Sequence, residues 1–267
     1  MKKSKLILPA IAAAGLFAFM IAPEKATEGK KAPFAGRNFA HRGLHTKDGV
    51  TPENSLPAFK AAAALGYGVE LDVHLSKDGQ VVVFHDDTLE RMCGVDDKIE
   101  NLTYKNLCKL KLGNTDNKIP LLSEVLEVLD GAPIILEIKR GSHNKELCEK
   151  TLGFIDGYKG DVCVESFDPT IVHWFKKHAP DILRGQLSAD RLEGQPKVLE
   201  FALSHLMLNF LGRPNFVAYG IGKKPLSVRL CEKMGAMKVT WTSHGEENEK
   251  NSDAVIFEHY LPNVRYK

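Results

Sequence analysis

Two carboxylates two positions apart are the first residues in this sequence whose types and spacing could do chemistry. Glu70 and Asp72 interrupt an apolar run, so on a β-strand both side chains point to the same face. That face is either solvated or turned to a cavity, and burying two like charges in a cavity is costly without a compensating cation. A divalent ion with oxygen ligands removes that cost, so the pair predicts a metal site.

The same pattern returns at the ends of two other apolar runs. Glu137 and Lys139 end one of them, which gives a third carboxylate and a cation on one strand face. His85 and Asp86 follow another, which gives a candidate acid or base beside a carboxylate that would orient the imidazole.

His41 and Arg42 close the first apolar run of the chain's body. A lone histidine is more often a surface or core residue, but the guanidinium beside it suits two-point binding of phosphate. Acids and bases thus stand at the ends of four expected strands. Because barrels build their sites at the carboxyl ends of their strands, this pattern indicates a metal-assisted active site.

The elements that must position these residues are short strands that alternate with helices. The first strand is expected to end at residue 40, and the others to cover 69–75, 80–84, 134–138, 162–164, 182–187, 216–219, 238–241 and 254–257. Helices are expected over 54–65, 121–129, 169–178, 196–211 and 226–234. This alternation predicts an α/β fold, a (β/α)8 TIM barrel with a small insertion after the second strand, between residues 78 and 120. A doubly wound open sheet is the alternative, but no G-x-G-x-x-G motif follows the first strand.

The composition narrows the class of protein. The chain has 267 residues, of which 43% are hydrophobic and 26% are charged, as in an ordinary globular domain. A net charge of +2 argues against a nucleic-acid partner. Five cysteines without a C-x-x-C pair argue against a zinc ribbon.

The N-terminus differs from this body. Three lysines in the first five residues precede an uncharged apolar run over residues 6–23. The run predicts a hydrophobic helix that anchors the chain in the cell membrane as a single pass, with the body outside the cytoplasm. A cleaved signal peptide is the alternative, and the body would then be secreted. We therefore expect an anchor or signal segment over 1–23, a tether over 24–37 and the barrel domain over 38–267.

The order and spacing of the polar motifs carry a more specific signal. The chain resembles the glycerophosphodiester phosphodiesterase family, a group of TIM-barrel phosphodiester hydrolases. The matching motifs run from about residue 38 to 258 and are His41-Arg42-Gly43, Pro52-Glu53-Asn54-Ser55, Glu70-Leu71-Asp72-Val73, Ser76-Lys77-Asp78-Gly79, His85-Asp86-Asp87-Thr88, Ile119-Pro120-Leu121, Glu137-Ile138-Lys139, Ser166-Phe167-Asp168-Pro169 and Trp241-Thr242. The match weakens at the end, where Phe257-Glu258-His259-Tyr260 replaces the usual Thr-Asp-x-Pro-like ending.

The resemblance implies roles for the acids and bases. His41 and His85 would be the acid–base pair, because imidazoles titrate near neutral pH. Glu70, Asp72 and Glu137 would be the metal ligands. An all-oxygen ligand set favours one divalent cation, Ca²⁺ or Mg²⁺, over zinc.

The resemblance also implies a set of substrate-binding residues. Arg42 and Lys139 would neutralise the phosphate, and Phe167 and Trp241 would line the glycerol or headgroup side. Two further residues would brace Arg42 or His41 from behind: Glu53 and Asn54.

The remaining titratable residues are expected to be less important. His45, His244 and His259 belong to a group of histidines expected at the surface or in caps. His74 lies shortly after Asp72 and is expected to be no metal ligand, on the opposite strand face. Glu165 ends an expected strand and could support the site from behind.

The implied activity is metal-dependent hydrolysis of a small glycerophosphodiester to sn-glycerol 3-phosphate and an alcohol. A lysophospholipase D-like or cyclic-phosphate-forming cleavage of phospholipids on the same barrel is the first alternative. A non-catalytic phosphate-binding protein is the second, but a mere binder has no need of an acid–base pair.

Overall fold

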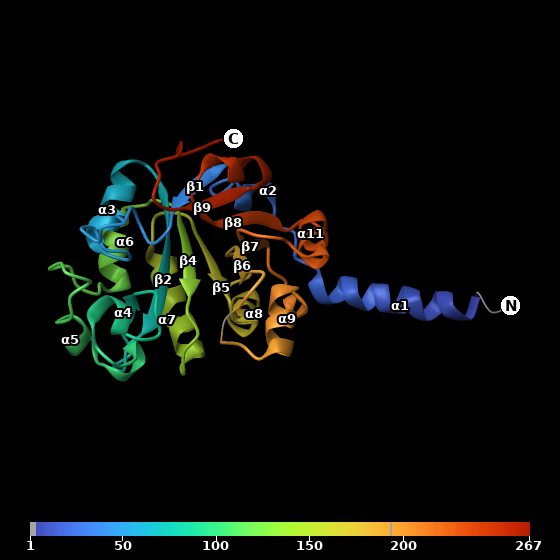
Figure 1. The fold of residues 1–267 in the computed structure, drawn as a ribbon, viewed down its shortest axis with the longest axis horizontal. Coiled ribbons are helices and arrows are strands. Elements are labelled where there is room, and N and C mark those ends of the chain that lie inside the picture. Colours follow the sequence, from blue (N-terminus) through green and yellow to red (C-terminus); the bar gives the residue numbers. More distant parts are fainter. Residues whose placement is uncertain (1–3, 193) are drawn as a thin grey trace.

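Eight parallel strands close into a barrel in the computed structural model, which describes residues 4–192 and 194–267 (Figure 1). Each strand pairs in parallel with the next, and β1 pairs with both β9 and β2, which closes the ring. The expected (β/α)8 TIM barrel is confirmed. Its strands are β1 (Arg37–Ala40), β2 (Gly68–Leu75), β4 (Ile134–Ile138), β5 (Val162–Ser166), β6 (Arg184–Ser188), β7 (Phe216–Gly220), β8 (Met237–Ser243) and β9 (Ala254–Phe257).

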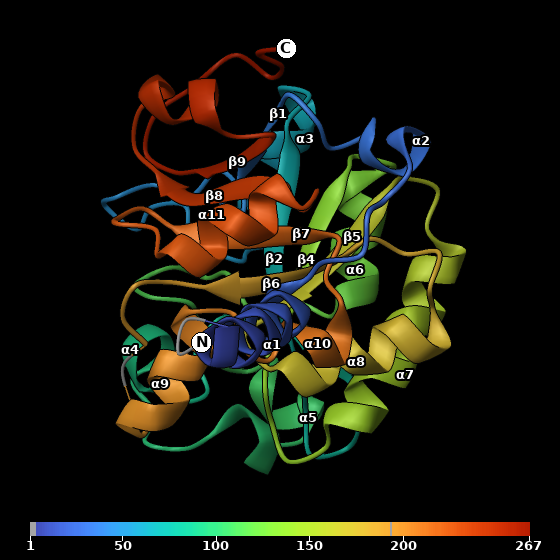
Figure 2. The ribbon, with the colours of Figure 1, turned by 90° about the vertical axis from the view of Figure 1, so that its right-hand side faces the viewer.

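Helices cover the outside of the barrel (Figure 2). The main ones are α3 (Leu56–Ala64), α6 (Leu122–Leu129), α7 (Asn144–Gly157), α8 (Pro169–His178), α9 (Lys197–Ser204), α10 (Asn209–Gly212) and α11 (Leu226–Lys233). The single helix expected over 196–211 is two helices, α9 and α10, since the chain turns at Leu206, whose φ is 58°. The helix α7 was not expected from the sequence, because few of its residues are buried and its apolar stripe is therefore weak.

The expected insertion after the second strand is present. Its strand β3 (Val81–Val83) pairs antiparallel with β2, and the short helices α4 (Glu90–Cys93) and α5 (Tyr104–Leu107) follow. Its apolar side chains form a small core of their own beneath the chain that carries His85. The backbone N–H of Phe84 donates to the Asp72 carbonyl at 3.0 Å, so the insertion holds His85 beside β2.

The barrel interior is apolar at the amino ends of the strands. Phe39, Ile135, Phe216 and Met237 pack there, and side chains two positions further along several strands are polar. A Cβ on Gly185 would lie only 2.0 Å from the Phe216 ring, so that ring fits the interior because the neighbouring strand carries a glycine.

The N-terminal segment begins with α1 (Ser4–Ile21), which projects away from the barrel (Figure 1), and continues through α2 (Glu28–Lys31). The end of α1 contacts the body: the Phe19 ring stacks on Phe210, and the Arg213 guanidinium donates to the Phe19 carbonyl at 2.7 Å. Over the described ranges, we find no helix with the length and apolar character that crossing a membrane requires. The expected membrane anchor is therefore unsupported here, and a position outside the cytoplasm stays a prediction.

The glycine–phenylalanine contact inside the barrel gives a first prediction. Replacing Gly185 by Ala should lower the free energy of unfolding by about 1–3 kcal/mol, because a buried methyl group would overpack the interior. Urea denaturation measures this loss. Gly153 is the matched control: it lies on the exposed side of α7 with nothing within 4 Å of an added Cβ. Gly153→Ala should raise stability by about 0.5–1 kcal/mol, and equal effects at both positions would contradict the packing argument.

Candidate active site

The carboxyl ends of β2 and β4 bring three carboxylates together. Asp72 pairs with Glu137 in the parallel register, and Glu70 lies two positions before Asp72 on the same face. One oxygen from each of the three lies within 4.8 Å of the others, and all three side chains are buried. The structure thus assembles the carboxylate cluster that the sequence predicted: Glu70, Asp72 and Glu137.

The Lys139 ammonium faces this cluster. The Lys139 Nζ lies 2.9 Å from Glu137 Oε1 and 3.4 Å from Asp72 Oδ1. Burial disfavours the charged lysine, but Glu137 and Asp72 outweigh that effect and raise the pKa of Lys139. The lysine charge offsets only part of the negative charge of the three carboxylates.

The pKa values in the cluster show the strain of burying like charges. Burial raises the pKa of Glu70 well above its usual range, and the Asp72 carboxylate adds to the effect. Burial likewise raises the pKa of Glu137. Burial also opposes ionisation of Asp72. The positive charges of Lys139, His85 and Arg42 outweigh this effect and hold the pKa of Asp72 low. Asp72 Oδ1 is buried and forms no hydrogen bond, although the Lys139 Nζ lies 3.4 Å away, so this oxygen is available to a metal ion.

Arg42 lies across the cluster from Lys139. Its backbone has a positive φ of 52°, and its N–H donates to Glu70 Oε2 at 3.0 Å. Its guanidinium lies 2.7 Å from Glu53 Oε1 and 3.6 Å from Asp72 Oδ2. Asn54 Nδ2 donates to Asp72 Oδ2 at 2.8 Å. Glu53 and Asn54 therefore lie where they brace Arg42 and Asp72.

His85 is held by a carboxylate beside it in the sequence. Its Nδ1 lies 2.6 Å from Asp86 Oδ1, so an Nδ1–H donated to Asp86 leaves Nε2 free to accept a proton. Burial opposes ionisation of the Asp86 carboxyl group. The hydrogen bonds from His85 and Arg91 outweigh this effect and hold the pKa of Asp86 well below its usual range. His74 lies two positions beyond Asp72 and therefore on the same face of β2, which corrects the expectation, and its Nε2 lies 3.2 Å from the His85 carbonyl.

Arg91, which was not expected from the sequence, joins the two halves of the site. Its guanidinium donates to Asp86 at 2.6 Å and to Glu53 at 2.7 Å. Burial alone would raise the pKa of Glu53, but Arg91 and Arg42 together lower it to about 2. No local pattern marks Arg91, because its two partners come from different loops.

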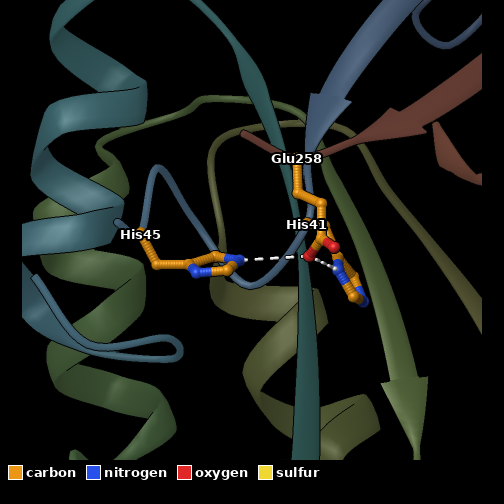
Figure 3. Close-up of side chains that lie close together, drawn as sticks. All are labelled: His41, His45 and Glu258. Atoms are coloured by element: carbon orange, nitrogen blue, oxygen red, sulfur yellow. Dashed lines mark hydrogen bonds and ion pairs between the residues drawn. The ribbon is translucent and has the colours of Figure 1, made fainter. Parts of the chain in front are cut away.

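His41 is held by a carboxylate from the far end of the chain (Figure 3). Its Nδ1 lies 2.8 Å from Glu258 Oε2, and its Nε2 lies 3.9 Å from Glu70 Oε2. Burial lowers the pKa of His41, although Glu258 opposes the shift. Burial also opposes ionisation of Glu258, but His41 and His45 prevail and hold the pKa of Glu258 well below its usual range.

The divergent ending of the chain therefore contributes a site residue. In the sequence, Glu258 stands out only as a departure from the family ending, although its place directly after the last strand is a signal for a site residue. The same region corrects a second expectation. His45 was expected at the surface, but its side chain is only 10% exposed, with Nε2 3.3 Å from Glu258.

Two aromatic side chains form an apolar wall of the site. The Phe167 and Trp241 rings meet edge to face with centroids 5.7 Å apart, and both pack against the interior of the barrel. Trp241 Nε1 donates to the Ala218 carbonyl at 3.0 Å, which fixes the indole. That these two rings line the glycerol or headgroup side stays a prediction.

A closed barrel with acids and bases gathered at the carboxyl ends of its strands is the architecture of a TIM-barrel enzyme. Residues 41–258 match the Glycerophosphoryl diester phosphodiesterase family. The chain belongs to that family.

Two relatives of known name show how much of the chain is similar in sequence. Lysophospholipase D GDPD1 of Rattus norvegicus is 38% identical over 143 residues, which cover 49% of this chain and 44% of that protein. A glycerophosphodiester phosphodiesterase of Caldanaerobacter subterraneus subsp. tengcongensis is 35% identical over 160 residues, covering 55% of this chain and 65% of that one. The chain thus spans between about half and two thirds of the length of these relatives.

Solved structures show the same fold. A phosphodiesterase of Oleispira antarctica in complex with the product sn-glycerol-3-phosphate is similar with a TM-score of 0.68 and 25% identity, over 85% of this chain and 94% of that one. A glycerophosphodiester phosphodiesterase of Thermotoga maritima is similar with a TM-score of 0.61 and 30% identity, over 82% and 93%.

Glu165 on β5 gives a prediction for stability against pH. Its side chain is buried beside the cluster, and its Oε2 has no hydrogen-bond donor. Burial, with a smaller contribution from the Glu137 charge, raises the pKa of Glu165 well above the usual range. A raised pKa means that its contribution to stability is full below the ordinary glutamate pKa of about 4.3 and declines as the pH rises. Glu165→Gln should therefore become more stable than the parent protein between pH 4.5 and 7.

Urea denaturation at several pH values, with chelator present, measures this difference. The control is Glu149→Gln on the exposed side of α7, which should leave the pH dependence unchanged. A gain for Glu165→Gln that does not grow with pH would contradict the prediction.

Proposed function

We propose that the protein hydrolyses glycerophosphodiesters to sn-glycerol 3-phosphate and an alcohol. The observation that carries the proposal is the convergence of three buried carboxylates with two histidines, each held by its own carboxylate, at one mouth of the barrel. Membership of the family and the product named for the Oleispira antarctica structure support the same reaction.

The carboxylate cluster is suited to one divalent cation, Ca²⁺ or Mg²⁺. Glu70, Asp72 and Glu137 offer only oxygen donors, and Asp72 Oδ1 is buried without a donor of its own. When bound, the ion would neutralise negative charge on the phosphate and stabilise the charge that develops there. Arg42 and Lys139 add fixed positive charge on either side of the cluster.

The two histidines would move the protons. Glu258 and Asp86 accept from the Nδ1–H groups of His41 and His85, so each Nε2 is left to exchange a proton with the substrate. One imidazole takes the proton of the attacking group, and the other donates a proton to the leaving alkoxide. Phe167 and Trp241 exclude water from the headgroup side.

A lysophospholipase D-like reaction is the second candidate. The names of the relatives from Rattus norvegicus, Mus musculus and Homo sapiens favour it, at 35–38% identity. Against it, the apolar side chains of the insertion pack into their own core rather than toward the site. We therefore favour the small glycerophosphodiester.

Product analysis distinguishes the candidates. The full chain is incubated with a panel of glycerophosphodiesters and lysophospholipids, and ³¹P NMR follows the products. The neighbouring glycerol hydroxyl is well placed to attack phosphorus, so a cyclic phosphate could form first and then open with water. We expect sn-glycerol 3-phosphate at the end. A cyclic phosphate that persists, or a preference for long-chain lipids, would support the second candidate, and absence of turnover would support a phosphate-binding protein.

The carboxylate cluster gives a prediction for metal dependence. Glu70→Gln, Asp72→Asn and Glu137→Gln should each abolish turnover and release one bound divalent ion, because each removes a charged ligand. Metal content and calorimetric titration with Ca²⁺ and Mg²⁺ measure the loss, and Glu149→Gln should keep both properties. Full activity of the parent protein in excess chelator would contradict the assignment of these three carboxylates as metal ligands.

The histidines give a prediction for the rate. His41→Ala and His85→Ala should lower kcat by ~10²–10⁴-fold while the carboxylate cluster still binds its ion, since only proton transfer is lost. His143→Ala, at the exposed start of α7, should leave kcat unchanged. Near-normal turnover in either site variant at neutral pH would remove that histidine from the proposed mechanism.

A further inference from the structure

Four imidazoles surround the Glu258 carboxylate, more than the proposed reaction uses. Oε2 lies 2.8 Å from His41 Nδ1 and 3.3 Å from His45 Nε2. Oε1 lies 3.6 Å from His259 Nε2 and 3.8 Å from His244 Nε2. Figure 3 shows His41 and His45 approaching the same carboxylate oxygen from different directions.

His45 is the unexplained member of this group. Its side chain is nine-tenths buried, and its Nε2 faces Glu258 without forming a hydrogen bond of good geometry. A buried imidazole nitrogen without such a partner is costly and calls for a ligand. The His259 ring meets the His45 ring edge to face with centroids 4.8 Å apart, so it borders the same space.

The spacing of these atoms suits a transition-metal ion. One donor atom each from His41, His45 and Glu258 lies within 4.8 Å of the other two. Around tetrahedral zinc, with bonds of about 2.0–2.2 Å, neighbouring ligand atoms are about 3.3–3.5 Å apart. Small side-chain rotations therefore bring the three donors to coordination distance.

The backbone holds these donors in place. His41 directly follows β1 and Glu258 directly follows β9, and the His41 N–H donates to the Phe257 carbonyl at 2.9 Å. The Glu258 N–H donates to the Ser243 carbonyl at 3.0 Å. Two adjacent barrel strands thus fix the spacing between two of the donors.

We propose that His41, His45 and Glu258 form a second metal site, for an imidazole-preferring divalent ion of the zinc class, with His259 beside it as a fourth donor. The site differs in chemistry from the carboxylate cluster, because two of its three donors are nitrogen and imidazole suits zinc better than Ca²⁺ or Mg²⁺.

Occupation of this site inhibits the enzyme, a consequence that rests on the proposed function of His41. A metal bound at Nδ1 uses the lone pair there and displaces the Nδ1 proton. The one proton of the neutral ring then resides on Nε2. That nitrogen no longer accepts a proton from the attacking group, and Glu258 no longer orients the ring.

Binding is tested apart from activity, with Co²⁺ as a spectroscopic substitute for zinc. The full chain carrying Asp72→Asn, which disables the carboxylate cluster, should give the visible absorption of low-coordinate Co²⁺, and Zn²⁺ should abolish it. Adding His45→Gln should weaken this binding at least about tenfold, the size of effect that even supporting residues have. His143→Gln, an exposed histidine, is the matched control.

His259→Asn is the second variant, because asparagine tolerates the positive φ of 63° at that position. It should weaken Co²⁺ binding less than His45→Gln does. Equal Co²⁺ binding with and without His45, or no absorption in the Asp72→Asn protein, would overturn the proposed site.

Inhibition is measured with the optimal concentration of Ca²⁺ or Mg²⁺ while free Zn²⁺ is raised. The parent protein should lose activity, and His45→Gln should need at least about tenfold more Zn²⁺ for the same fractional loss, each protein being compared with its own activity before zinc is added. Equal sensitivity of the two proteins would overturn the inhibitory role. If the parent protein hydrolyses no glycerophosphodiester without zinc, the proposed function fails, while the Co²⁺ experiment still decides the metal site.

Discussion

The burial of three carboxylates at one end of the barrel is the constraint on which the rest of the site depends. Glu70, Asp72 and Glu137 lie close together out of water, where their mutual repulsion is weakly screened. The surroundings offset this with the Lys139 ammonium, the Arg42 guanidinium and hydrogen bonds to the carboxylates. The remaining excess of negative charge is what makes the cluster a suitable place for a divalent cation.

A network of charges connects this cluster to the two histidines. Arg91 binds Asp86 and Glu53, and Glu53 binds Arg42, which faces Asp72. The carboxylate that holds His85 is thus connected through arginines to the cluster, whereas the carboxylate that holds His41 comes from the opposite end of the chain. Both carboxylates stay ionised because their partners hold their pKa values low, so each imidazole keeps one orientation.

Much of the barrel could be predicted from the sequence because strand patterning is local. Alternation with a period of two places Glu70 and Asp72 on one face whatever the rest of the chain does. The same local logic located His85 beside Asp86. It failed for α7, because a helix with a mostly solvated surface has little apolar periodicity to recognise. Local patterning also predicted one helix in place of α9 and α10, because no residue type in that stretch indicates the turn at Leu206.

The sequence by itself determined which side chains stand at strand ends, and therefore the carboxylates, the two histidines and the basic residues of the site. Only the tertiary structure decided which of them meet. Glu258 reaches His41 because β9 pairs with β1, a contact between residues 217 positions apart that exists only once the barrel closes. His45 is buried for the same reason, whereas sequence spacing alone predicted a surface residue. Pairings of this kind depend on strand register across the whole ring, which no local pattern encodes.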